Sequence, residues 1–179
     1  MTVTKEVGST KAVFKIHING PINAVWAELI KTGEPQASFF NNVLHTSGGV
    51  QPGSVMQMRT KNGRYVGVVG KILEIDPPRR YSHTMRFTHL DDPECVIVYE
   101  LAEKDGGTEF TLTVENMTEG TKSAKSMAQG GPMICSTMKA VIEKGGAPLM
   151  TRVLFGVFGA LAPVTTPAKC KVENWPLEG

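Results

Sequence analysis

Residues 66–87, VGVVGKILEIDPPRRYSHTMRF, contain two strand-like runs on either side of a Pro-Pro-Arg-Arg corner. The second run alternates between large and mostly polar side chains, as a strand with two different faces does. Its face of large side chains consists of Tyr81, His83, Met85 and Phe87. Histidine and methionine set among aromatic rings are unusual for an ordinary sheet core. The pattern therefore favours a strand that lines a cavity, in a protein that binds an apolar molecule.

The same pattern of strands and turns extends in both directions from this corner. Turn residues separate the runs, for example Gly48-Gly49, Asn62-Gly63 and Asp105-Gly106-Gly107. Connections this short join antiparallel neighbours. We therefore predict antiparallel strands at residues 43–46, 54–60, 66–75, 80–88, 94–103 and 108–117.

Helical periodicity flanks the strands. Residues 11–19 alternate as one further strand, and residues 21–31 repeat apolar side chains at helical spacing from Pro21 onward. A second short helix is expected at 34–40, with Phe39 and Phe40 facing inward. Residues 121–145 are helical in pattern but contain Gly130-Gly131-Pro132. Because proline inside a helix costs about 3 kcal/mol, we favour two consecutive helices over one kinked helix whose glycines approach a ligand or a facing sheet.

Three motifs of the chain resemble those of one family. They are 21-PINAVW-26, 70-GKILEIDPPRRY-81 and 106-GGTEFTL-112. Over residues 12 to about 145 the chain is thus similar to the START-like or SRPBCC superfamily. Within it, the chain looks like the branch resembling the C-terminal domain of the activator of heat-shock-protein-90 ATPase. The resemblance implies an α+β helix-grip fold, in which a curved antiparallel sheet of about six to seven strands surrounds a long C-terminal helix, with a cavity between them.

The resemblance leaves ligand and partner open. The chain departs from the family's usual pattern at residues 94–99 and 122–127. The family itself includes binders, enzymes and proteins of no assigned role, and a shared fold does not fix a function.

We divide the chain into a helix-grip domain at 1–146 and a C-terminal extension at 147–179. The extension begins with an apolar helix at Leu149–Leu161, whose only charge is Arg152. One face of it carries Met150, Val153, Leu154, Val157, Phe158 and Leu161, whereas Phe155 lies off that face. Such a face needs cover from the domain, from a twin subunit or from a membrane surface, and the lack of a Lys/Arg cluster makes the membrane the weakest option. The sequence leaves open whether the helix makes a homodimer or forms a lid over the cavity.

Composition bounds the class of protein. The 179 residues are 41% hydrophobic, and 19 basic against 17 acidic residues give a net charge of +2, so nothing indicates a nucleic-acid partner. Cys95, Cys135 and Cys170 are widely spaced, which favours free thiols over disulfides or a zinc site. Residues 1–10 do not resemble a signal peptide, and the longest apolar stretch is too short for membrane insertion. We expect a soluble, cytoplasmic protein.

The candidate ligand site combines aromatic, methionine and aliphatic side chains from several predicted elements. Methionines from three separate elements favour a cavity that adapts to its ligand. The expected lining is Phe39, Phe40, Met56, Met58, Tyr81, His83, Met85, Phe87, Tyr99, Met127, Ile134 and Met138. Within it, His83 and Tyr99 are the candidate polar groups that orient a ligand, and an ordinary core role stays open for both. No cofactor and no metal are expected.

Three functions remain after this step. The first is binding of a hydrophobic or amphipathic small molecule, lipid-like or polycyclic. The second is an enzyme of the cyclase, dehydratase or hydrolase type, in which His83 acts as the acid or base in the same cavity. The third is a chaperone cofactor or another protein-interaction module that works through its surface.

Overall fold

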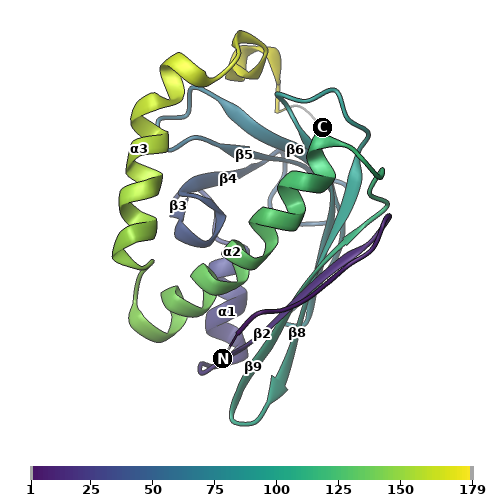
Figure 1. Ribbon diagram of the computed structural model, residues 1–179, viewed down its shortest axis with the longest axis vertical. Helices are drawn as coiled ribbons and strands as arrows, with labels where there is room; N and C mark the ends of the chain where they lie inside the picture. Colours follow the sequence, from purple (N-terminus) through teal and green to yellow (C-terminus); the bar gives the residue numbers. More distant parts are fainter. Residues whose placement is uncertain (1, 178–179) are drawn as a thin grey trace.

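The computed structural model, which describes residues 2–177, is an α+β helix-grip fold built on one antiparallel sheet of nine strands. The strand order is β1-β2-β9-β8-β7-β6-β5-β4-β3. The strands are β1 Thr4–Val7, β2 Ala12–Ile18, β3 Pro35–Gln36, β4 Asn42–Thr46, β5 Val55–Arg59, β6 Val66–Asp76, β7 Arg80–Phe87, β8 Cys95–Lys104 and β9 Gly107–Glu115. The α-helices are α1 Ile22–Leu29, α2 Lys122–Lys144 and α3 Leu149–Thr165, and the 3-10 helices are η1 Ala37–Phe39, η2 Ala168–Cys170 and η3 Val172–Asn174. In Figure 1, α2 crosses the inside of the curved sheet and α3 stands to one side of it.

The corner between β6 and β7 is held by close backbone approach and by ion pairs. A Cβ on Gly70 would collide with the backbone carbonyl of Thr84, so only glycine permits this spacing. Arg80 then bridges two carboxylates, with Nε 2.8 Å from Glu74 and an amino nitrogen 2.7 Å from Glu100. Gly70, Glu74 and Arg80 all lie within the 70–81 motif. The motif therefore contains residues that hold the two strands together at this corner.

One continuous helix, α2, spans Lys122–Lys144, so the prediction of two consecutive helices is wrong. Two contacts make the uninterrupted helix possible. Gly131 lets the helix backbone lie directly on the ring of fully buried Phe14 in β2, where a Cβ would clash. Pro132 has no N–H to offer the carbonyl of Ala128, but Lys5 Nζ of β1 donates to that carbonyl at 3.1 Å. The facing sheet therefore accommodates both the glycine and the proline.

Two elements at the sheet edges differ from the prediction. β1 was not predicted, because all four of its residues are exposed and it pairs with β2 through its backbone alone. The expected helix at 34–40 is instead the two-residue strand β3 followed by the single turn η1. Phe40 and Asn41, which follow η1, both have positive φ values of 60° and 59°. These additions raise the predicted six to seven strands to nine.

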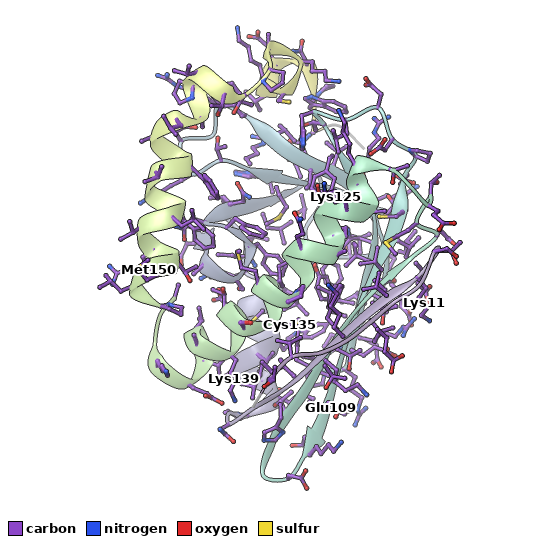
Figure 2. The ribbon with its side chains drawn as sticks, viewed as in Figure 1. Lys11, Glu109, Lys125, Cys135, Lys139 and Met150 are labelled. Atoms are coloured by element: carbon purple, nitrogen blue, oxygen red, sulfur yellow. The ribbon has the colours of Figure 1, made fainter. Side chains whose placement is uncertain are left out.

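The side of α3 that packs on the domain is not its wide apolar face. Phe155 and Ala162 are its buried residues, while the expected apolar face is exposed. Figure 2 shows Met150 on α3 pointing away from the rest of the chain. The wide apolar face of α3 points away from the domain. Only the row of residues through Phe155 contacts the domain, where Phe155 packs on Phe40.

The tail after α3 returns to the sheet. Lys171 forms a bridge with Tyr65, and Gln57 Nε2 donates to the carbonyl of Trp175 at 2.9 Å. The Arg86 guanidinium lies 5.4 Å from the Trp175 ring centroid. The extension is therefore attached to the domain both at Phe155 and through its tail.

Within residues 2–177, no helix combines the length and apolarity needed to cross a membrane. The three cysteines are free and buried. Among these same residues no group of three or more His, Cys, Asp or Glu side chains is arranged to hold a metal ion.

Candidate functional site

A hollow of about 230 Å³, partly open to solvent, lies between α2, η1 and the strands β4 to β8. Eleven of the twelve predicted lining residues border it. They are Phe39 and Phe40 beside η1, Met56 and Met58 on β5, Tyr81, His83, Met85 and Phe87 on β7, Tyr99 on β8, and Met127 and Ile134 on α2. The twelfth, Met138, lies outside the hollow and is fully buried in the core, farther along α2.

The sequence prediction missed several lining residues. They are Leu29, Gln36, Asn42, Leu44, Val68, Ile97, Ser126 and Gly130. Ile97 had a usable signal, because it shares a strand face with Tyr99. Gln36 and Asn42 had none, since they flank an irregular turn whose side-chain directions follow no period.

An aromatic cluster forms the inner wall of the hollow. Tyr81 on β7 is directly paired with Tyr99 on β8, and their rings stack with centroids 5.7 Å apart. The His83 ring lies against both, at 5.3 Å from Tyr81 and 5.9 Å from Tyr99. Phe39 meets the edge of Tyr99 at 5.9 Å. Cross-strand pairing and the period of two place three hydrogen-bonding rings side by side.

His83 is held in one protonation state by its surroundings. Its Nδ1 lies 2.7 Å from the backbone carbonyl of Thr84, which can only accept, so Nδ1 carries the hydrogen. Burial lowers the pKa of His83 to about 4, against a smaller opposing effect of the Thr84 hydrogen bond. The imidazole is therefore neutral near pH 7, with the lone pair on Nε2.

The two tyrosines differ in what their hydroxyls reach. Burial raises the pKa of both phenols, so both stay protonated. Among the described residues, Tyr81 Oη is the one side-chain polar atom that is inaccessible to solvent and has no hydrogen-bond partner. His83 Nε2 and Tyr99 Oη also lack a partner in that part of the chain, but they are not fully inaccessible to solvent. Because both residues border the hollow, these two atoms are the candidates to meet a ligand there.

Phe40 connects the hollow to α3. Its ring packs on the buried Phe155 ring of α3 with centroids 5.4 Å apart, and its Cζ would lie 3.7 Å from a Cβ placed on Gly130 of α2. The left-handed backbone at Phe40 and Asn41 is costly for residues other than glycine. This unusual turn directs a large ring between two helices at the border of the hollow.

Two other polar side chains, those of Arg59 and Gln36, form hydrogen bonds within the protein. Arg59 sits at a register shift in β5, and its Nε donates to Gln57 Oε1 at 2.9 Å. Gln36 borders the hollow, but its amide donates to the carbonyls of Glu28 and Leu29 at 2.8 and 3.1 Å. Asn42 and Ser126 also border the hollow, and His83 and Tyr99 are the polar groups of its aromatic wall that are candidates to orient a ligand.

Solved structures with this fold come from several bacteria. CalU16 from Micromonospora echinospora is 16% identical with a TM-score of 0.62, over 91% of this chain and 99% of that one. The Aha1 dimer from Colwellia psychrerythraea is 17% identical with a TM-score of 0.61, over 75% of this chain and 97% of that one. DynU16, a protein in the dynemicin biosynthetic locus, is 14% identical with a TM-score of 0.61, over 78% of this chain and 49% of its own.

These structures share the fold of this chain. Among curated proteins, none matches the chain. A family model described as "Activator of Hsp90 ATPase homolog 1-like protein" matches residues 19–143, which ends before α3. Because the match spans more than half of the chain, and because the 70–81 corner and the helix-grip architecture agree with it, the protein belongs to the family of activator of Hsp90 ATPase homolog 1-like proteins.

Proposed function

We propose that this protein binds a hydrophobic or amphipathic small molecule, lipid-like or polycyclic, in the hollow between α2 and the sheet. The observation that carries the proposal is the hollow itself, about 230 Å³ with largely apolar walls. Protein interiors are normally packed without voids much larger than a water molecule. A mostly apolar pocket with a few inner polar groups is the usual form of a small-molecule site.

The composition of the walls supports the same proposal. Four methionines border the hollow, and their flexible, polarizable side chains adapt to ligands of varied shape.

The chemistry of His83 favours binding over acid–base catalysis. A group whose pKa is lowered to about 4 is neutral at pH 7 but a weak base. No Asp, Glu, Lys or Arg borders the hollow among the described residues, so no charged partner is present to raise its basicity. His83 and Tyr99 would then orient a ligand instead of transferring its protons.

Two neighbouring valines on β6 allow a matched test. Val68 borders the hollow, whereas Val69 is directed to the other face of the strand and does not. We expect Val68→Phe to weaken binding of the uncharged dye Nile red at least tenfold, and Val69→Phe to leave it nearly unchanged. Native mass spectrometry of the purified protein would also detect a retained ligand. Equal dye binding by both variants, with both folded by circular dichroism, would refute the site.

The exposed face of α3 supports a second proposal, that two copies of the chain pair through it. Eight large apolar side chains of α3 are 38–86% exposed. Large apolar side chains that are exposed together on one side of a helix mark a site of protein association. Arg152 is the only charge on the helix, which argues against an anionic membrane as the partner.

Two leucines of similar exposure separate this interface from general surface effects. Leu161 on α3 is 49% exposed and Leu73 on β6 is 45% exposed. We expect light scattering to show a dimer for the parent chain and for Leu73→Glu, and a monomer for Leu161→Glu. A monomeric parent chain at about 100 µM would refute the dimer, and recovery of a stoichiometric chaperone from native lysate instead would favour the role of chaperone cofactor.

We also propose that the protein works in the reducing cytoplasm. Its three buried free thiols and its net charge of +2 agree with that compartment.

A further inference from the structure

The walls of the hollow select for the charge of a ligand. No ionised side chain borders it among the described residues. An ion moved from water into such a place without a counter-charge loses its hydration, and the loss is not repaid. The hollow is therefore suited to an uncharged molecule, or to the uncharged end of a larger one.

The inner polar atoms select further, because one of them can only accept. The Thr84 carbonyl fixes the hydrogen of His83 on Nδ1, and Nε2 is left as a bare acceptor on a residue that borders the hollow. A ketone, ester or ether oxygen placed there would face another acceptor. A ligand group meeting Nε2 must itself donate a hydrogen bond.

The neighbouring Tyr99 limits which chemical group of a ligand fits beside His83. Its ring lies 5.9 Å from that of His83, and its hydroxyl, which also lacks a partner, can donate to a ligand oxygen. A hydroxyl group on the ligand meets both requirements, since it donates to Nε2 and accepts from Tyr99 Oη. The aromatic rings of Tyr81, Tyr99 and Phe39 border the same hollow, and aromatic walls favour a flat ring system as the ligand body.

We propose that the ligand is an uncharged, flat, hydroxyl-bearing molecule, such as a phenol on a fused-ring body, with its hydroxyl donated to His83 Nε2 and hydrogen-bonded by Tyr99. This inference rests on the proposed binding function and specifies its chemistry. Neither the family match nor the similar structures supply it. It follows from the tautomer of one histidine and from the absence of charged side chains along the described walls.

Four naphthalene probes test each element of the inference at pH 7.5, by calorimetry or by probe fluorescence. We expect 2-naphthol to bind three- to tenfold more tightly than naphthalene, the range that one net hydrogen bond provides. The ether 2-methoxynaphthalene, which can accept from Tyr99 but cannot donate to His83, should bind more weakly than 2-naphthol. The ionised 2-naphthoate should bind more weakly than naphthalene.

Two variants test whether His83 causes the preference for 2-naphthol over naphthalene. In His83→Phe the ratio of 2-naphthol to naphthalene affinity should fall to about one, while naphthalene binding, retained, shows that the hollow is intact. Tyr99→Phe should reduce the same ratio in part. An unchanged ratio in His83→Phe, or tight binding of 2-naphthoate, would overturn the inference.

The outcomes also separate this inference from the proposed function. If naphthalene binds but the hydroxyl brings no preference, only the ligand class is wrong. If no probe binds at all, and Nile red does not bind either, the binding function itself fails.

Discussion

Replacing Gly131 by alanine measures how closely α2 is packed on the sheet. A Cβ at this position would lie 2.7 Å from Phe14 Cζ and closer still to two other ring atoms. Phe14 is fully buried, so its ring has no free space to enter. Overpacking of this kind costs about 1–3 kcal/mol, whereas alanine gains about 1 kcal/mol over glycine in a helix. We therefore expect Gly131→Ala to lower the free energy of unfolding by up to about 2 kcal/mol.

The adjacent glycine provides the control. A Cβ on Gly130 would lie 3.7 Å from Phe40 Cζ, which is an ordinary contact. Gly130→Ala should therefore keep the helix-propensity gain and stabilise the protein by up to about 1 kcal/mol. Equilibrium urea denaturation, followed by circular dichroism at constant m-value, compares the two variants. If Gly131→Ala proves as stable as Gly130→Ala, the close packing of α2 on Phe14 is wrong.

Three further predictions concern the hollow and its border. Between pH 7 and pH 5 the free energy of unfolding should fall by about 2 kcal/mol through His83 alone, because the unfolded histidine takes up a proton near pH 6.5 and the folded one only near pH 4. Urea denaturation at each pH measures this fall, and the variant His83→Gln should lack it. Tyr81→Phe should be neutral or stabilising by about 1 kcal/mol, since it removes a sealed hydroxyl without a partner, and a loss above 1 kcal/mol in urea denaturation would reveal a partner. Phe155→Ala should cost about 3 kcal/mol and speed amide exchange throughout α3, whereas exposed Phe158→Ala should change that exchange far less.

The sheet could be predicted from the sequence where burial leaves a pattern. Alternation at Phe14, Ile16 and Ile18 and at Tyr81 to Phe87 marks strands with one buried face, and the structure confirms both. Gly70 and Arg80 mark the corner through steric and ionic needs that are local to the motif. The lining residues on β5, β7 and β8 follow from the same alternation.

Where a contact depends on the whole fold, the sequence was insufficient. The proline in α2 is tolerated because Lys5, more than a hundred residues away, replaces the lost donor. β1 has no buried residue, so no periodicity identifies it. On α3 the wide apolar stripe did not reveal which line of the helix packs on the domain, because Phe155 meets Phe40 there. The two faces are distinguished by tertiary contacts, which bury Phe155 and Ala162.

The returning tail determines which motions are open to α3. A helix attached at one end can swing away as a flap does, but α3 is joined to α2 on one side and fastened through Lys171 and Trp175 on the other. Such a segment can bow or slide without leaving the domain. Exchange of molecules between the hollow and solvent would then depend on rearrangement of the Phe40 and Phe155 rings, and its rate would reflect side-chain repacking more than a hinged opening.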